Sequence, residues 1–341
     1  MRKRRWTALC VSAALVLAGC AGAPDGQVHV PATSPAATDH ADPWGGEQVN
    51  QDTPVLDVVH DAAFAGFGQF LFPRGETLTD RSMTLGQIDA LLPYHSCIRA
   101  ETTVDVIASM QERVRAGETI FYDIYTEQEK QEDPSKANTG LFFFRGAPDA
   151  PFAIVSAGGG FSYVGSIHES LPHALALSRQ GYHAFALQYR TGGAQVACED
   201  LAAAITFVFA HAQELGVNPQ GYSLWGGSAG ARMAAYLGSY GPAAFGGAEL
   251  PRPAAVIMQY TGHSDFTAND PPTYACVGEN DGIANWRTMR RRIDALNARG
   301  IPTEFHHYPN LGHGFGLGIG TTAEGWIDDA IAFWNRQRRA L

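Results

Sequence analysis

The chain has 341 residues, of which 45% are hydrophobic and 17% are charged, and its formal net charge at pH 7 is −10. This length and composition fit a globular protein with one large domain or two small ones. The acidic balance argues against nucleic acid as a partner, because a nucleic-acid-binding surface needs a basic patch.

The N-terminus has the pattern of an export signal. Basic residues 2–5 precede an apolar run over residues 6–16, which is too short for a membrane-spanning helix. The tetrapeptide Leu-Ala-Gly-Cys at 17–20 resembles a bacterial lipoprotein signal. This resemblance implies removal of residues 1–19, lipidation of Cys20 and attachment to a membrane of the cell envelope. An ordinary secretory signal with an incidental cysteine is the alternative.

Two segments separate this signal from the main domain. Residues 20–52 are rich in Ala, Pro, Asp and Gly without apolar periodicity, which predicts a flexible tether. Residues 53–118 are expected to form an extension with helices over 85–92 and 103–114, and to supply any lid. Four phenylalanines in it are interpreted as packing residues, with a hydrophobic substrate lip as the alternative: Phe64, Phe67, Phe70 and Phe72.

From about residue 119 the pattern alternates between strands and helices. Strands are predicted over residues 119–125, 140–144, 152–156, 182–189, 222–225, 254–260, 273–277 and 303–308. Helices are predicted over residues 168–179, 197–215, 231–237, 285–298 and 322–338. The charged stretch 127–138 is predicted to be a solvated hairpin loop. This alternation predicts an α/β domain over residues 119–341, with a mainly parallel sheet covered by helices on both faces.

Three cysteines remain once the signal and Cys20 are set aside. An exported protein can form disulfides, and three thiols allow one bridge whose partners the sequence does not determine. Cys276 lies in an apolar strand and is interpreted as a buried free thiol. Cys97 and Cys198 are therefore the candidate pair.

The run Gly-Gly-Ser-Ala-Gly at 226–230 fits the pattern G-x-S-x-G between a predicted strand and a predicted helix. In that setting Ser228 would lie on a strained turn with its hydroxyl exposed. The N-terminal N–H groups of the following helix would point at the group that Ser228 attacks. A glycine-rich turn without chemistry is the alternative.

A serine hydroxyl needs a neighbouring base to become a nucleophile. His313 lies in a glycine-rich loop after the strand over 303–308 and before the last helix, where such a base is expected. His306 and His307 fall within the strand and are interpreted as structural residues.

A carboxylate should orient that base. Asp281 follows the strand over 273–277 at its C-terminal end, where active sites of open α/β sheets gather. Glu279 and Asp265 are the alternatives, and a turn residue before Gly282 is the structural interpretation of Asp281.

The order Ser228, Asp281, His313 is that of the α/β-hydrolase superfamily. The run Ala-Gly-Gly-Gly at 157–160 resembles the His-Gly-Gly-Gly oxyanion loop of lipases and esterases, with alanine in the place of histidine. Residues 119–341 are similar to the acetyl-esterase/lipase or carbohydrate-esterase-like group, which further stretches also fit: 187–190, 199–201 and 312–315.

This resemblance implies a serine hydrolase of carboxylic esters, acting on a small molecule or on acyl groups of a carbohydrate. It also implies an oxyanion hole formed by the N–H groups of Gly159, Gly160 and Ala229, each donor stabilising the transition state by roughly 3–4 kcal/mol. No cofactor or metal is expected, because the chain contains neither H-E-x-x-H nor paired C-x-x-C.

Three alternatives remain. A dinucleotide-binding loop would need a complete G-x-G-x-x-G, which the glycine run lacks. A peptidase of prolyl-oligopeptidase type would share the catalytic domain but usually carries a propeller, for which the chain has no room. A non-catalytic binding lipoprotein would use the same scaffold.

Overall fold

A computed structural model describes residues 48–73, 78 and 80–340, which fall within one compact unit of the chain. The predicted signal over residues 1–19, Cys20 and most of the tether over residues 20–52 lie outside the described residues. Within the described part, no helix has both the length and the apolar character needed to cross a membrane.

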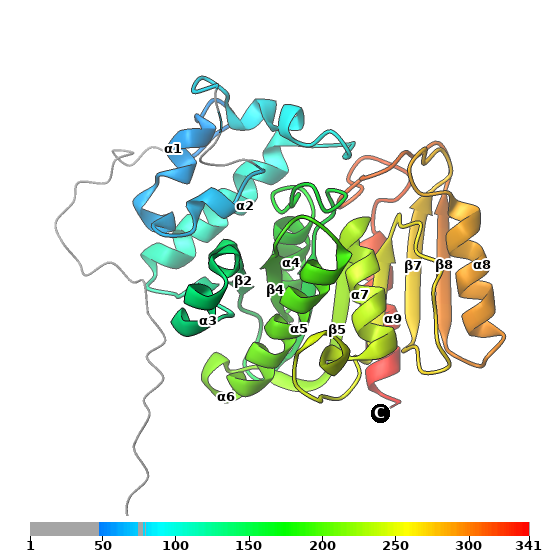
Figure 1. Ribbon diagram of the computed structural model, residues 1–341. Helices are drawn as coiled ribbons and strands as arrows, with labels where there is room; N and C mark the ends of the chain where they lie inside the picture. Colours follow the sequence, from blue (N-terminus) through cyan, green and yellow to red (C-terminus); the bar gives the residue numbers. More distant parts are fainter. Residues whose placement is uncertain (1–47, 74–77, 79, 341) are drawn as a thin grey trace, which may run out of the picture. The chain divides into compact units, whose positions relative to one another are not determined.

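An eight-stranded sheet forms the centre of the fold, with the strand order β1-β2-β4-β3-β5-β6-β7-β8 (Figure 1). Strand β2 pairs antiparallel with β1 and β4, and all other neighbours pair parallel. This arrangement confirms the predicted fold class. The strands are β1 Phe121–Tyr122, β2 Gly140–Phe144, β3 Pro151–Ser156, β4 His183–Gln188, β5 Asn218–Gly227, β6 Ala255–Gln259, β7 Thr273–Gly278 and β8 Thr303–Tyr308.

Helices cover both faces of this sheet (Figure 1). His173 of α4 packs edge-on against Trp326 of α9 on one face, with ring centroids 5.3 Å apart, whereas α5 and α7 pack together on the other face. The helix predicted over 197–215 is divided at His211 into α5 and α6. The α-helices from α4 onward are α4 Ser170–Arg179, α5 Ala194–Ala210, α6 Ala212–Leu215, α7 Ala229–Tyr240, α8 Trp286–Asn297 and α9 Trp326–Arg338.

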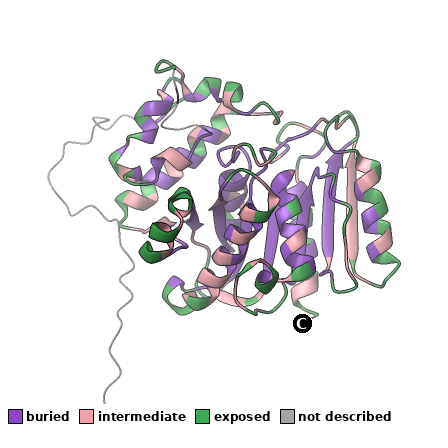
Figure 2. Cartoon of the chain, in the orientation of Figure 1, coloured by how far each residue is buried: buried purple, intermediate pink, exposed green. Residues whose placement is uncertain are grey.

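Burial explains why the strands form where they do. Every residue of β2, β3, β6 and β7 is buried (Figure 2), as expected for strands covered by helices on both faces. The edge strand β8 is half-buried along its whole length, which fits its mixture of polar and aromatic residues.

The stretch 127–138 is not the predicted hairpin loop but two short helices, α3 (Glu127–Glu132) and the 3₁₀-helix η5 (Pro134–Asn138). Thr126 and Glu129 form a capping box at the start of α3, and the Asp133 side chain accepts a hydrogen bond from the Ser135 N–H at the start of η5. These caps satisfy the free N–H groups of helices that bury no residue.

The disulfide considered between Cys97 and Cys198 is absent, and both thiols are free. Cys97 is exposed in the loop before α2, whereas Cys198 is buried in α5. Cys276 is a buried free thiol in β7, as predicted.

The N-terminal extension packs against the edge of the sheet through its phenylalanines. Phe64, Phe67 and Phe72 are buried, and Phe67 stacks on Phe121 of β1 with ring centroids 4.8 Å apart. Phe70 is half-buried. The extension contains α1 Val55–Val59, the 3₁₀-helices η1 Ala62–Phe64, η2 Gly68–Phe70 and η4 Leu85–Leu91, and α2 Ala100–Arg115. A further 3₁₀-helix, η6, spans Pro242–Phe245.

Candidate active site

The predicted site residues all follow C-terminal ends of parallel strands. Ser228 follows β5, Asp281 follows β7, His313 follows β8, and the glycine loop over residues 157–160 follows β3. Because these strands are parallel, their C-terminal ends share one edge of the sheet. The structure brings the four segments together at that edge.

Ser228 lies on a strained turn. Its φ of 50° and ψ of −112° are unfavourable for a residue with a side chain, which agrees with the strained strand-to-helix turn that the G-x-S-x-G pattern predicts. The flanking glycines permit the turn, since a Cβ on Gly226 would lie 2.3 Å from the carbonyl carbon of Gly230, and one on Gly230 would lie 1.9 Å from the Ser156 oxygen.

The serine, histidine and aspartate form a continuous hydrogen-bonded chain. Ser228 Oγ lies 3.0 Å from His313 Nε2, and His313 Nδ1 lies 2.7 Å from Asp281 Oδ2. An ionised carboxylate accepts hydrogen bonds, so Nδ1 carries the proton and Nε2 is free to accept the serine proton. The other carboxylate oxygen, Asp281 Oδ1, accepts the N–H groups of Ile283 and Ala284 at 2.8 and 2.7 Å.

The alternative residues lie elsewhere. The side chains of Glu279 and Asp265 are exposed. His306 and His307 lie within β8, as the sequence predicts. The His307 ring packs against Trp286 at 4.3 Å between centroids.

The glycine loop lies directly against Ser228. A Cβ on Gly158 would lie 2.9 Å from Ser228 Cβ. Gly159 and Gly160 have φ angles of +131° and +63°, which favour glycine. Within the described part of the chain, the N–H groups of Gly159, Gly160 and Ala229 donate to no backbone acceptor.

Sequence reasoning missed the residue that supports this loop, Glu169. The Gly158 N–H donates to Glu169 Oε2. Glu169 Oε1 accepts hydrogen bonds from the Tyr260 hydroxyl and from His95 Nε2, both at 2.9 Å. The side chains of His95 and Glu169 are each 1% exposed. No motif or spacing in the sequence marks Glu169 for this role, because it follows the glycine loop at a distance of nine residues and its partners His95 and Tyr260 come from distant segments.

Electrostatics keep the Glu169 carboxyl ionised. Burial alone would raise its pKa, but the charge and hydrogen bond of His95 and the Gly158 N–H hold the pKa well below its usual range. His95 therefore carries a proton on Nε2, facing the carboxylate. Its Nδ1 lies 2.9 Å from the Tyr163 hydroxyl.

Another buried histidine supports the loop that carries His313. His168 Nε2 lies 2.9 Å from the Gly314 carbonyl oxygen. Burial, together with the nearby His95, lowers the pKa of His168 to about 4. The ring is therefore neutral at pH 7 and donates its Nε2–H to that carbonyl.

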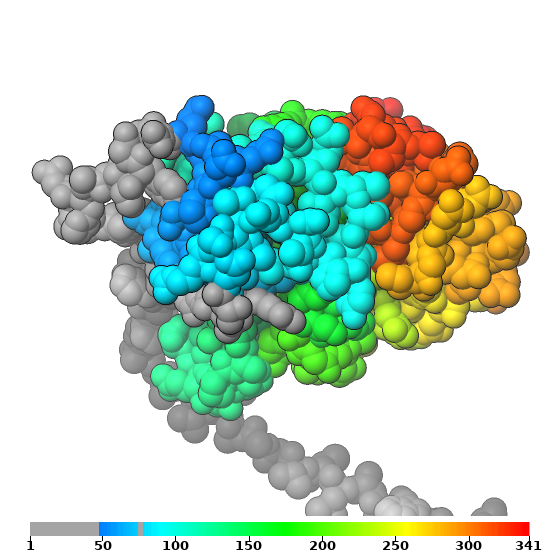
Figure 3. All heavy atoms as spheres, turned by 90° about the horizontal axis from the view of Figure 1, so that it is seen from above, coloured from blue at the N-terminus to red at the C-terminus, as the bar shows by residue number. Residues whose placement is uncertain are grey.

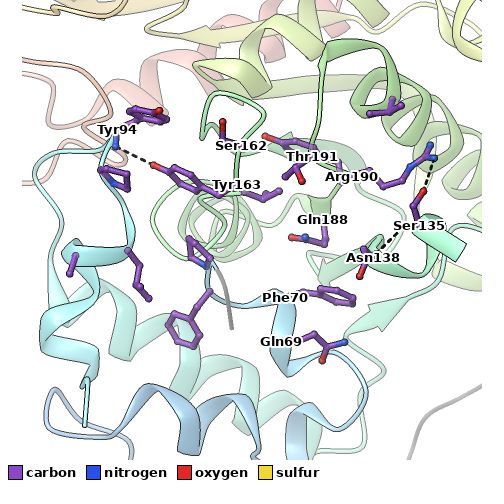
Figure 4. A pocket seen from close by; sticks show the side chains of 18 residues that line it. Gln69, Phe70, Tyr94, Ser135, Asn138, Ser162, Tyr163, Gln188, Arg190 and Thr191 are labelled. Atoms are coloured by element: carbon purple, nitrogen blue, oxygen red, sulfur yellow. Dashed lines mark hydrogen bonds between the residues drawn. The ribbon is translucent and has the colours of Figure 1, made fainter. Parts of the chain in front are cut away.

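A cavity of about 780 Å³ lies between the extension and the α/β domain (Figure 4). Its wall combines aromatic rings with hydroxyl and amide groups, among them Phe70, Tyr94, Asn138, Ser162, Tyr163, Gln188 and Thr191. Arg190 also lines the cavity, but its guanidinium is paired with three carboxylates: Asp133, Glu199 and the fully buried Asp200. The cavity wall thus suits an uncharged ligand.

Comparisons with known proteins agree with this architecture. Residues 145–271 match the model of the BD-FAE family. No curated protein matches the sequence.

Several solved structures share the fold. An acetyl ester-xyloside bifunctional hydrolase from Caldicellulosiruptor lactoaceticus is 22% identical, with a TM-score of 0.55 over 63% of this chain and 95% of its own. The α/β hydrolase MGS-M1 from a Medee basin deep-sea metagenome library is 20% identical, with a TM-score of 0.52 over 59% and 93%. A sugar hydrolase from Lactococcus lactis is 24% identical, with a TM-score of 0.50 over 59% and 95%. The chain therefore has the α/β-hydrolase fold, and its central region is similar to the BD-FAE family.

Proposed function

We propose that the protein is a serine hydrolase that cleaves carboxylic esters, with Ser228, His313 and Asp281 as its catalytic triad. The observation that carries this proposal is the hydrogen-bonded chain from Ser228 Oγ through the His313 ring to Asp281, at 3.0 and 2.7 Å. The strained backbone at Ser228 supports it, because this strain serves to present the hydroxyl.

In the first half of the reaction, Ser228 Oγ attacks the carbonyl carbon of the ester while its proton passes to His313 Nε2. Asp281 stabilises the resulting imidazolium. The N–H groups of Gly159, Gly160 and Ala229 stabilise the oxyanion, and each such donor typically changes the rate about 10²–10³-fold. The tetrahedral intermediate then collapses, the alcohol leaves with the proton from His313, and the acyl group remains on Ser228.

Hydrolysis of the acyl-enzyme completes the cycle. His313 takes a proton from a water molecule as the water oxygen attacks the acyl carbon. The second tetrahedral intermediate expels Ser228 Oγ, which recovers the proton from His313. Deacylation uses the same three side chains and the same oxyanion donors as acylation.

The substrate we propose is an uncharged ester of a small molecule or of a carbohydrate. The paired charge of Arg190 and the mixed aromatic and hydroxyl wall of the cavity support this choice. Two of the similar structures belong to an acetyl ester-xyloside hydrolase and a sugar hydrolase. The cavity is lined by Ser162 and Tyr163, just beyond the glycine loop, but not by Ser228, His313 or Asp281, so we propose that it holds a part of the ester remote from the scissile carbonyl.

We further propose that the protein is exported and anchored to a membrane of the cell envelope through a lipid on Cys20. The Leu-Ala-Gly-Cys sequence after a short apolar run supports this. Mass spectrometry of the mature protein from its membrane fraction should find an acylated Cys20 at the N-terminus. An unmodified N-terminus at another residue, in protein recovered free in the medium, would contradict it.

A panel of esters tests the enzymatic proposal. The wild-type protein should hydrolyse p-nitrophenyl acetate, and acetylated xylo-oligosaccharides would show whether it also acts on carbohydrates. Ser228→Ala should lower kcat by roughly 10⁴-fold or more while keeping the melting temperature. A Ser228→Ala variant that retains wild-type kcat on these esters would overturn the proposal.

A further inference from the structure

A short segment of the extension, residues 93–96, lies between the two loops that carry the proposed chemistry. We name it the strap; it lies between η4 and α2. We propose that the strap fixes the relative positions of two loops, with His95 as the positioning residue. One is the glycine loop over residues 157–160, called the oxyanion loop below, and the other is the loop that carries His313, called the histidine loop. This inference rests on the proposed ester hydrolysis.

The first contact of the strap is with the oxyanion loop. The His95 ring donates its Nε2–H to Glu169, and the same carboxylate accepts the Gly158 N–H. Gly158 in turn lies against Ser228. His95 therefore acts on the oxyanion loop through a single buried carboxylate. Without the proton of His95, the charge of Glu169 would lose one of its three hydrogen-bond donors in a site closed to water.

A second contact is with Tyr163, which follows the glycine loop and donates its N–H to the Gly159 carbonyl oxygen at 3.3 Å. The Tyr94 N–H donates to the Tyr163 hydroxyl at 3.2 Å (Figure 4). The two tyrosine rings stack with centroids 5.7 Å apart. A Cβ on Gly160 would lie 3.2 Å from the Tyr94 ring, so the strap lies directly beside one of the proposed oxyanion donors.

The opposite side of the strap holds the histidine loop. The Ser96 N–H donates to the Gly314 carbonyl oxygen at 3.0 Å, and the Ser96 hydroxyl donates to the His313 carbonyl oxygen at 2.5 Å. The approach is close enough that a Cβ on Gly314 would lie 2.6 Å from the His95 Cα. Viewed from above, the cyan part of the extension meets the orange-red segment after β8 (Figure 3).

These contacts give the extension a positioning role at the proposed site. Because the strap bonds both to the support of the oxyanion loop and to the backbone of the general base, it sets the distance between them. A small misplacement of a catalytic group costs rate more than binding. Loss of a strap contact should therefore lower kcat and leave KM nearly unchanged.

The test compares strap variants on p-nitrophenyl acetate. His95→Leu keeps much of the side-chain volume but removes the donor to Glu169, and we expect kcat to fall by roughly 10–100-fold with KM within about three-fold. His95→Gln restores an N–H donor and should recover kcat to within about five-fold of wild type. Ser96→Ala should lower kcat by about three- to ten-fold.

Asp105→Asn is the matched control. Asp105 of α2 forms an exposed ion pair with Arg179 of α4 at 2.6 Å, so it also joins the extension to the catalytic domain but does not reach the site. Its kcat should stay within about two-fold of wild type, since exposed ion pairs contribute little.

The outcomes separate this inference from the proposed function. A folded His95→Leu variant with wild-type kcat would overturn the strap proposal while ester hydrolysis stands. If His95→Leu does not fold, Ser96→Ala decides, and an unchanged kcat there overturns the proposal. A wild-type protein that hydrolyses no ester would overturn the proposed function and the strap's role with it.

Discussion

Asp281 Oδ2 lies 2.7 Å from His313 Nδ1, and this contact fixes which ring nitrogen faces Ser228. Asp281→Asn keeps the size of the side chain but can present an N–H to Nδ1, which favours the wrong tautomer. We expect kcat on p-nitrophenyl acetate to fall by up to about 10⁴-fold, with little change in melting temperature.

Glu279→Gln is the control for that variant. Glu279 is exposed and lies two residues before Asp281, so its charge should affect kcat by less than about three-fold. If Glu279→Gln were the inactive variant and Asp281→Asn were near wild type, the assignment of Asp281 would be wrong.

If the cavity holds part of the substrate, its volume should limit the size of the esters that the protein hydrolyses. Thr191 is exposed and lines it, so Thr191→Trp should narrow the space available to a bulky ester. We expect the KM for a bulky aryl ester to rise by about ten-fold, whereas kcat/KM for the acetate should stay within about two-fold. Equal effects on both esters would show that the cavity does not hold the substrate.

The packing of Phe67 is expected to contribute to the stability of the fold where the extension meets the sheet. Its buried ring stacks on Phe121 and packs edge-on against Phe142. Phe67→Ala should lower the free energy of unfolding by about 3 kcal/mol or more, because it leaves a cavity between the extension and the sheet. Urea unfolding measures this change, and a loss below about 1 kcal/mol would contradict the packing role.

Acid should destabilise the fold through its buried histidines. Burial lowers the pKa of His173 from 6.5 to about 4. The unfolded chain therefore takes up this proton near pH 6.5, whereas the folded chain resists it until about pH 4. Stability contributed by the neutral ring is present above pH 6.5 and is lost as the pH falls through this window, by up to about 1.4 kcal/mol per pH unit.

A variant isolates that contribution. His173→Gln stays neutral at every pH, so its melting temperature should fall less steeply than that of wild type between pH 6.5 and 4.5. The slopes are compared by calorimetry in buffers of equal ionic strength. Identical slopes for the two proteins would rule out His173 as a source of the acid sensitivity.

The sequence was most informative where the signal is local. The strand ends before Ser228, Asp281 and His313 carry short motifs, and the parallel sheet brings such ends to one edge. The two short helices over 127–138 were missed because their polar residues lack apolar periodicity, and caps rather than burial support them.

Contacts between segments that lie far apart in the chain could not be predicted from sequence patterns. His95 reaches Glu169, and Ser96 reaches His313, across unrelated stretches of chain. No spacing rule connects a histidine in an extension with a glutamate behind a glycine loop. The strap and its contacts could therefore be identified only in the three-dimensional structure. The catalytic roles of Ser228, Asp281 and His313 remain predictions that geometry supports.

The central claim is that Ser228 is the nucleophile, and covalent labelling tests it most directly. The full protein is treated with a fluorophosphonate, digested and mapped by mass spectrometry, with Ser228→Ala as the control. We predict a single adduct on Ser228, loss of ester hydrolysis in step with labelling, and no adduct in the variant. An adduct on another residue, or an active protein that is never labelled, would contradict the claim.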